Sequence, residues 1–150
     1  MDRQFVIENS KERERLRKLV SGITEKELTL LLYKEGWTVA AALAHLAFWD
    51  QRRIILVRKW KEKGFTPSPM DEDTMNDALV PFFLALPPKK AADLAVSIAE
   101  ELDSELEESS AEFIATMENS GDRHALNRAI HRKMHLDDIE ALLQIKRKTK

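Results

Sequence analysis

The chain of 150 residues contains no cysteine. This absence excludes disulfides, thiolate metal ligands and a cysteine nucleophile, and it fits a protein of a reducing compartment. The N-terminus lacks the apolar run of a signal peptide, so the expected location is cytoplasmic. No stretch approaches the roughly 20 apolar residues of a membrane span, so we expect no membrane partner.

Glycine and proline are also scarce, with 4 and 5 residues, which is too few for an all-β chain with many tight turns. Neither sign of charge is in large excess, because the net charge is -2. A general nucleic-acid binder would show a basic excess, so we expect no nucleic-acid partner. Hydrophobic residues make up 43% and charged residues 33%, as in ordinary globular proteins, and the length suits a single domain over residues 1–150.

Helical signals run through the chain, and we find no β signal and no internal repeat. Apolar residues at helical spacing predict long helices over about residues 3–20, 39–63 and 89–117. A last long helix is expected from a cap at Asp122 to about Ile145, followed by a frayed basic tail. Shorter helices are expected after a capping box at Thr24 and over about residues 73–86. The pattern predicts an all-α four-helix bundle with one or two short extra helices.

Two of the four histidines, His131 and His135, lie four residues apart in the last predicted helix. This spacing stacks both imidazoles on one helix face, and the apolar residues around them predict that the rings point into the bundle. Each buried ring must satisfy two nitrogens, and a shared divalent metal ion would accept one nitrogen from each. The alternative is a pair of hydrogen-bonded or half-exposed histidines, and the spacing alone fits both.

His45 lies on the face of the second long helix that also carries Ala41 and Trp49. Taken alone, it is a typical core histidine bonded to a carbonyl. Together with His131 and His135 it makes three imidazoles from two helices, an arrangement typical of a catalytic metal site with one open position. Zinc, nickel, iron and other divalent ions accept imidazole, and zinc or nickel is our first expectation.

Other polar residues carry less specific signals. His124 is about two turns from His131, roughly 10 Å along the helix axis, so we expect it at a pocket rim rather than on the same ion. Asp138 lies close to the histidine face and could accept a hydrogen bond from a histidine that binds the metal. A solvated acid or a salt bridge is the simpler expectation. Asp50 is expected to face an arginine or solvent, and the three tryptophans are expected in the core or a pocket wall. No residue stands out as a general acid or base.

Two motifs resemble those of the DinB-like (DinB/YfiT) four-helix proteins. Residues Trp37–Asp50 resemble the second-helix motif, a tryptophan followed by a capping Ser or Thr and then a His-Leu pair. Residues His131–Ile139 resemble the closing motif, His-x3-His-x3-Ile, with Asp137-Asp138 in place of the usual Gly-Gln. Asn76 resembles an asparagine that is common in members with this layout. The elements match in order over nearly the whole chain.

The resemblance implies an up-up-down-down four-helix bundle that is often dimeric, so it suggests a homodimer. It also implies a divalent metal ion held by His45, His131 and His135. Characterised relatives include S-transferases and isomerases that depend on mycothiol, bacillithiol or glutathione, and some metal-dependent hydrolases.

Three functions are compatible with these features. The first is a metal-dependent enzyme whose three-histidine site activates a low-molecular-weight thiol or water for S-transfer to, or hydrolysis of, a small-molecule substrate. Any such thiol must come from a small molecule, because the chain has no cysteine. The second is a non-catalytic helical-bundle protein that binds and sequesters a small molecule. The third is a helical interaction module with an apolar surface around residues 80–84.

Overall fold

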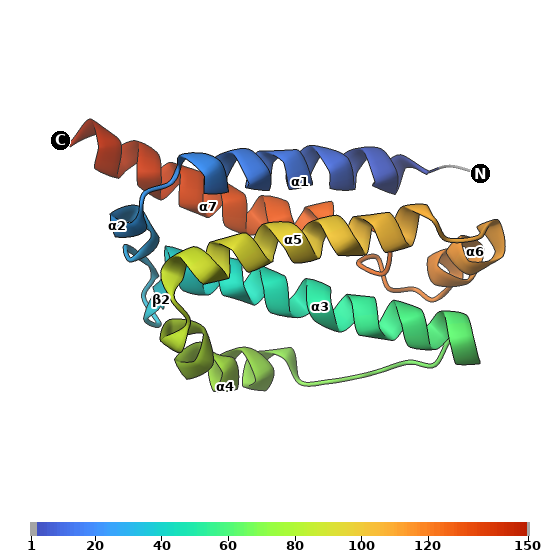
Figure 1. Cartoon of the computed structure of the whole chain (residues 1–150). Coiled ribbons are helices and arrows are strands. Elements are labelled where there is room, and N and C mark those ends of the chain that lie inside the picture. The colour runs from blue at the N-terminus through green and yellow to red at the C-terminus, as the bar shows by residue number, and fades with distance from the viewer. Residues whose placement is uncertain (1–2, 150) are drawn as a thin grey trace.

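The structure is a computed structural model that describes residues 3–149. Four long helices form a bundle (Figure 1): α1 (Gln4–Gly22), α3 (Val39–Lys63), α5 (Pro88–Glu107) and α7 (Ala129–Lys148). The connecting elements are α2 (Glu25–Leu28), α4 (Glu72–Ala85), α6 (Ala111–Asn119) and a hairpin of β1 (Leu31–Tyr33) and β2 (Trp37–Thr38). The all-α prediction is therefore confirmed.

The long helices run up, down, down and up in chain order. Lys61 near the end of α3 pairs with Glu105 near the end of α5 at 2.9 Å, so these two helices are parallel. Figure 1 shows α1 and α7 running together in the opposite direction. This order replaces the up-up-down-down order that the resemblance implied. The physical reason is the connection through residues 64–71 and α4, which returns the chain along the bundle before α5 begins.

A β-hairpin follows α2, although the sequence showed no β signal. The capping box expected at Thr24 is present, but Leu31 then pairs with Thr38 across two antiparallel strands. Gly36 occupies the turn with φ 95°, a left-handed conformation that glycine adopts without strain. The apolar run Leu30–Leu32 has no periodicity that separates a short strand from a helix, which is why the pattern did not reveal the hairpin.

The helix expected over about residues 89–117 is two helices, α5 and α6. Ser110 caps α6, because its Oγ accepts a hydrogen bond from the backbone N–H of Phe113 at 3.1 Å. Ser109 ends α5 by donating from its Oγ to the carbonyl of Glu105 at 2.9 Å. Apolar residues at helical spacing continue across this break, so spacing alone hid it.

The last helix begins at Ala129 and not after Asp122. The Asp122 carboxylate instead accepts a hydrogen bond from the backbone N–H of His124 at 2.8 Å, within the turns that precede α7. Asn9 of α1 provides the cap, because its Oδ1 accepts from the N–H groups of Arg128 and Ala129 at 2.7 and 3.0 Å. Asn127 adds a local cap, because its Oδ1 accepts a hydrogen bond from the backbone N–H of Ile130 at 3.3 Å. The sequence analysis placed the cap at Asp122 and missed this signal.

The carboxyl end of α7 is held against α2. The helix continues to Lys148, beyond the expected end near Ile145. Arg147 Nε donates to Glu27 Oε2 at 2.7 Å, so this part of the basic tail is ordered rather than frayed. The Arg147 guanidinium is the main reason why the pKa of the Glu27 carboxyl falls from 4.5 to about 2.

Two hydrophobic clusters form the core, one toward each end of the bundle. In the first, alanines of α3 and α5 such as Ala41 and Ala95 let the two helices pack closely. The second is built around residues such as Ile54, Leu102 and Ile114. Within residues 3–149, none of the helices combines the length and apolar character that crossing a membrane requires.

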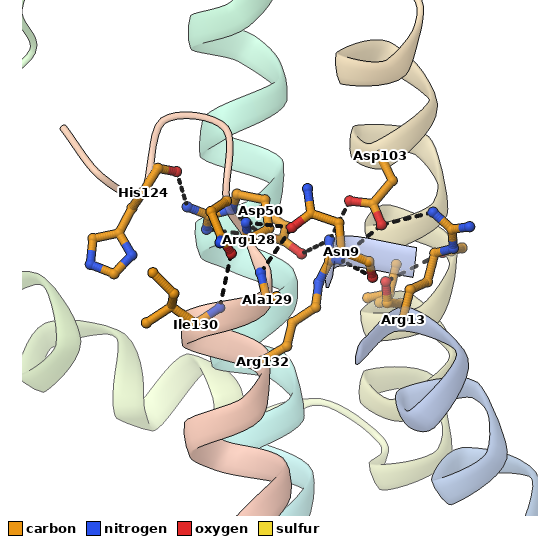
Figure 2. A network of polar contacts seen from close by, with 12 residues as sticks. Asn9, Arg13, Asp50, Asp103, His124, Arg128, Ala129, Ile130 and Arg132 are labelled. Atoms are coloured by element: carbon orange, nitrogen blue, oxygen red, sulfur yellow. Dashed lines mark hydrogen bonds and ion pairs between the residues drawn. The ribbon is translucent and has the colours of Figure 1, made fainter. Parts of the chain in front are cut away.

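Buried polar side chains form a layer of hydrogen bonds and ion pairs between the helices (Figure 2). Arg132, only 1% exposed, donates two hydrogen bonds to the carboxylate of Asp103, both at 2.8 Å. It also donates to Asp50 Oδ2 at 3.1 Å, and Arg128 Nε donates to the other oxygen of Asp50 at 3.0 Å. The arginine expected opposite Asp50 is therefore present. Arg13 of α1 also pairs with Asp103 Oδ2 at 2.8 Å, so three arginines surround two aspartates and together they fasten α1, α3, α5 and α7 to one another.

We expect Arg132→Leu to lower the free energy of unfolding by about 3–5 kcal/mol, because Asp103 and Asp50 lose buried partners. Urea denaturation followed by circular dichroism measures this change. Arg17→Leu is the matched control, since exposed Arg17 bonds Glu14 of its own helix and no other residue among those described, and its effect should stay within about 0.5 kcal/mol. Equal losses in both variants would contradict a structural role for the polar layer.

The Glu27–Arg147 pair predicts a specific pH dependence of stability. Because folding lowers the pKa of Glu27 from 4.5 to about 2, its carboxylate stabilises the fold above pH 4.5, and this contribution disappears as the pH falls toward 2. We therefore expect Glu27→Gln to cost about 1 kcal/mol at neutral pH, because Arg147 is half exposed and water screens the pair. The difference from the unmodified protein should shrink below pH 4.5 in denaturation experiments across pH. Glu25→Gln, at an exposed acid of the same helix, should show no such difference, and a pH-independent effect of Glu27→Gln would refute the interpretation.

Candidate metal centre

Three histidine rings meet between α3 and α7. The centroid of the His45 ring lies 4.8 Å from the centroids of His131 and of His135, and these two lie 4.9 Å apart. One ring nitrogen from each residue lies within 4.8 Å of the other two. The spacing of four residues stacks His131 and His135 on one face of α7, and the packing of α7 against α3 brings that face to His45.

Two ring nitrogens of the cluster face each other at close range. Nε2 of His45 and Nε2 of His131 lie 2.9 Å apart, which is a hydrogen-bond distance. Two imidazole nitrogens bound to one tetrahedral zinc ion at about 2.0–2.1 Å lie about 3.3 Å from each other, so a small separation of these rings would admit the ion. Nδ1 of His45 is buried and has no hydrogen-bond partner among residues 3–149. Whichever nitrogen carries the proton, a neutral His45 leaves a buried polar atom unpaired, which is unusual in a purely structural core.

Tyr33 and Asp138 set the orientation of the third ring. Tyr33 Oη donates to Asp138 Oδ2 at 2.6 Å and lies 2.8 Å from His135 Nδ1. Because the phenol has a single proton, His135 Nδ1–H is the donor to Tyr33 Oη, and Nε2 carries the lone pair. That Nε2 is buried and has no hydrogen-bond partner within the described part of the chain. In many metal sites a carboxylate accepts a hydrogen bond from the ring N–H of a metal-binding histidine. Here the phenol of Tyr33 stands between the carboxylate of Asp138 and the ring of His135.

The supporting tyrosine was missed by the sequence analysis. Tyr33 is the only tyrosine of the chain, yet it stands 102 positions from His135 in a hairpin that no local pattern revealed. Asp138 was considered as a support for the ligands, but a salt bridge or a solvated acid was the simpler expectation. The structure shows instead that Asp138 acts on His135 through Tyr33.

Burial keeps the three histidines neutral at physiological pH. Loss of hydration lowers the pKa of His45 to about 3, of His131 to about 2 and of His135 to about 4, from an ordinary 6.5. Neutral imidazoles retain a lone pair, which a metal ion requires of its ligands. Burial also raises the pKa of Tyr33, with a further contribution from Asp138, so that its phenol stays protonated.

Aromatic side chains enclose the histidine cluster. The ring centroid of Trp37 lies 4.8 Å from that of His45, and those of Trp49 and Phe83 lie 6.4 Å from it. Asn76 of α4 holds one of these rings, because its Oδ1 accepts a hydrogen bond from Trp49 Nε1 at 2.9 Å. The enclosure limits the access of water to His45 and leaves the approach to the cluster on the side of a neighbouring cavity.

A cavity of about 1120 Å³ extends from the histidines along α3. One wall is a single face of α3, formed by residues at helical spacing, namely His45, Trp49, Arg52, Arg53, Leu56 and Trp60. The segment after α3 and the start of α4 form a second wall, and residues before and within α7 form a third. His124 lines this cavity and stays outside the three-histidine cluster.

The family model of the DinB superfamily matches residues 8–143. The chain belongs to the DinB superfamily. No curated protein and no solved structure gives a significant match. The matched region of this DinB-superfamily chain includes all three clustered histidines and both residues that support His135.

Removing the phenol oxygen tests the support of His135. We expect Tyr33→Phe to weaken zinc binding about 10–100-fold, because the Nδ1–H of His135 loses its acceptor and the ring its fixed orientation. Competition with a chelating dye measures the affinity. Asp138→Asn should act in the same direction, whereas Asp137→Asn is the control, since Asp137 accepts from Arg15 and Lys133 on the outer face of α7. An unchanged affinity of Tyr33→Phe would exclude the supporting role.

Proposed function

We propose that this protein is a divalent-metal-dependent enzyme that uses a low-molecular-weight thiol or water for S-transfer to, or hydrolysis of, a small-molecule substrate. The observation that carries this proposal is the convergence of three neutral imidazoles from two helices at the end of a large cavity. Three histidines leave a position open for a reacting group, as catalytic sites do. Zinc or nickel is the proposed metal.

The residues of the site have distinct roles in this proposal. His45, His131 and His135 would hold the ion, each through one ring nitrogen. A divalent ion bound there supplies Lewis acidity, which lowers the pKa of a thiol or water and yields a nucleophile near neutral pH. Tyr33 keeps the proton of His135 on Nδ1, and Trp37 packs against His45 and restricts water.

The cavity favours a reaction of two small molecules. Its volume of about 1120 Å³ lies at or above the upper end of ordinary ligand pockets, which hold about 300–1,000 Å³. A thiol cosubstrate and an electrophilic acceptor fit in such a space together. The thiol would come from solution, because the chain has no cysteine.

A second candidate is a non-catalytic protein that sequesters a small molecule in the same cavity. It is favoured by the position of the acids among the described residues that line the cavity. All of them are exposed: Glu35, Glu72, Asp73, Asp77 and Asp122. None is therefore a buried general base next to the histidines. The two candidates differ in turnover, since only the enzyme converts a bound electrophile to product.

Replacing each histidine tests the proposal. We expect purified protein to contain about one zinc or nickel ion per chain, and His45→Ala, His131→Ala and His135→Ala each to weaken metal binding by at least about 100-fold, because two ligands remain. His124→Ala is the matched control and should retain the metal. Elemental analysis and chelator competition measure the metal.

Activity is measured separately from metal content. The metal-loaded protein is given glutathione or bacillithiol and the electrophile 1-chloro-2,4-dinitrobenzene, and conjugate formation is followed by absorbance. Hydrolysis of activated esters and amides is followed in parallel without thiol. We expect turnover that the histidine variants and a chelator abolish. A stable metal complex without turnover of any of these substrates would exclude the proposed chemistry and leave sequestration as the function.

A further inference from the structure

Arg53, a buried arginine of α3, lines the cavity with hydrogen-bond donors that no protein group uses. The residue is 8% exposed, and its Nη2 donates to Asp122 Oδ2 at 3.1 Å. Within residues 3–149, this is the only hydrogen bond of its guanidinium, so Nε and Nη1 have no acceptor. The guanidinium carbon lies 5.6 Å from the ring centroid of Trp60, which packs against the group.

The charge of Arg53 is only partly compensated. Its single ionic partner, Asp122, has a side chain that is 43% exposed, so water weakens the pair. Arg128 and Arg132 by contrast share the buried carboxylate of Asp50. Because Arg53 lines the cavity, its free N–H groups are available to an anion that enters it.

Arg52 adds a second cation on the same wall. Its Nη2 donates to the carbonyl and the hydroxyl of Ser68, both at 2.9 Å, in the segment that covers the cavity. No carboxylate of the described chain forms an ion pair with Arg52 within 4.0 Å. The acids that line the cavity from α4, such as Glu72 and Asp73, are exposed at its rim, where solvent screens them. Glu72 and Asp122 both attract the charge of Arg52. Arg53 is repelled by Arg52 and Arg128, and among the described residues Asp122 alone attracts it. The wall at Arg53 is therefore the part of the cavity where a carboxylate of a ligand would balance positive charge.

The distance between His45 and Arg53 along α3 determines how long a ligand must be to contact both. Arg53 follows His45 by eight residues, which corresponds to about 12 Å along the helix axis. Trp49 and Leu56 lie on the same cavity-lining face and give this wall apolar surface. The space from the histidines to the arginines suits a molecule with an apolar or mixed middle part and an anionic end.

We propose that Arg53, assisted by Arg52, binds a carboxylate of the substrate or cosubstrate, at a position about 12 Å along the axis of α3 from His45 of the histidine cluster. The ligand class is thus a small carboxylic acid whose reactive group and carboxylate stand at opposite ends of the cavity. That the other end of the ligand reacts at the histidines rests on the proposed function. The carboxylate-binding site is argued from the contacts of Arg53 and does not depend on that function.

A thiol of suitable length tests both ends together. In the cobalt-substituted protein, 8-mercaptooctanoate and its uncharged amide, 8-mercaptooctanamide, are titrated, and the thiolate–cobalt absorption band reports binding. We expect the acid to bind at least about tenfold more tightly than the amide, because a hydrogen bond between a guanidinium and a carboxylate is stronger than one to an uncharged amide. Arg53→Met should reduce the preference to less than about twofold, and Arg53→Lys should restore part of it by keeping the charge.

Two controls complete this titration. Arg58→Met should keep the full preference, since Arg58 is exposed on α3 and pairs with Glu101 and Glu105 outside the cavity. 3-Mercaptopropionate and its amide should bind equally within about twofold, because the short chain does not reach Arg53. Equal binding of the eight-carbon acid and amide, or a preference that survives in Arg53→Met, would overturn the proposal.

A metal-free arm separates this inference from the proposed function. Octanoate and octanamide are titrated into metal-free protein, and tryptophan fluorescence reports binding beside Trp49 and Trp60. Tighter binding of octanoate that disappears in Arg53→Met supports the carboxylate site even if the protein binds no cobalt. A thiolate–cobalt band without any preference for the acid supports the metal site and refutes the carboxylate site. Circular dichroism verifies that each variant is folded.

Discussion

The ion pair between Arg132 and Asp103 is the interaction on which the arrangement of this bundle depends. Arg132 directly follows His131, so the bonds that fix its guanidinium to α5 and α3 also fix the rotation of α7. A rotation by one residue, about 100°, would turn the histidine pair away from His45. Asn9 of α1 fixes the position of α7 along its own axis, because its Oδ1 accepts hydrogen bonds from the N–H groups of Arg128 and Ala129 at the start of that helix. The buried charges thus serve the geometry of the site as much as stability.

Desolvation disfavours the charged form of both kinds of cation-forming side chain in this protein, but the outcome differs. The histidines lose their protons on burial and become neutral donors of lone pairs. Arginine cannot give up its proton in the same way, so buried Arg132 and Arg128 keep carboxylates beside them. Arg53 is the exception in the cavity wall, where its partner is exposed. The interior therefore combines a neutral nitrogen cluster and an under-compensated cation in one cavity.

The hairpin after α2 shows how a small element completes a site made by long helices. Its first strand brings Tyr33 to His135, and its second brings Trp37 to His45. Without these contacts the cluster would be open to water on that side and His135 would lack its acceptor. Side chains from two strands and three helices thus surround the three histidine rings and restrict their orientation more than the long helices alone would.

Features that depend on a single helix could be predicted from the sequence. The spacing of His131 and His135 placed both rings on one face of α7, because the helical repeat alone determines which residues align. The capping box at Thr24 and the apolar stripes of the long helices are local in the same sense. The histidine of α3 was also found, since its neighbours on that face are small or aromatic. The all-α architecture follows from these local signals together with the scarcity of glycine and proline.

Features that join distant segments were decided only by the tertiary structure. Asn9 from α1 adds a second cap to the start of α7 beside the local one at Asn127, and Tyr33, 102 positions from His135 in the hairpin, sets the proton on that ring. The break before α6 and the direction of α5 depend on how the chain turns at the ends of the bundle. The physical reason is that buried polar groups form hydrogen bonds and ion pairs with whichever groups lie nearby in the folded protein, including groups of distant segments. The periodicity of a sequence shows only which residues share one face of one helix.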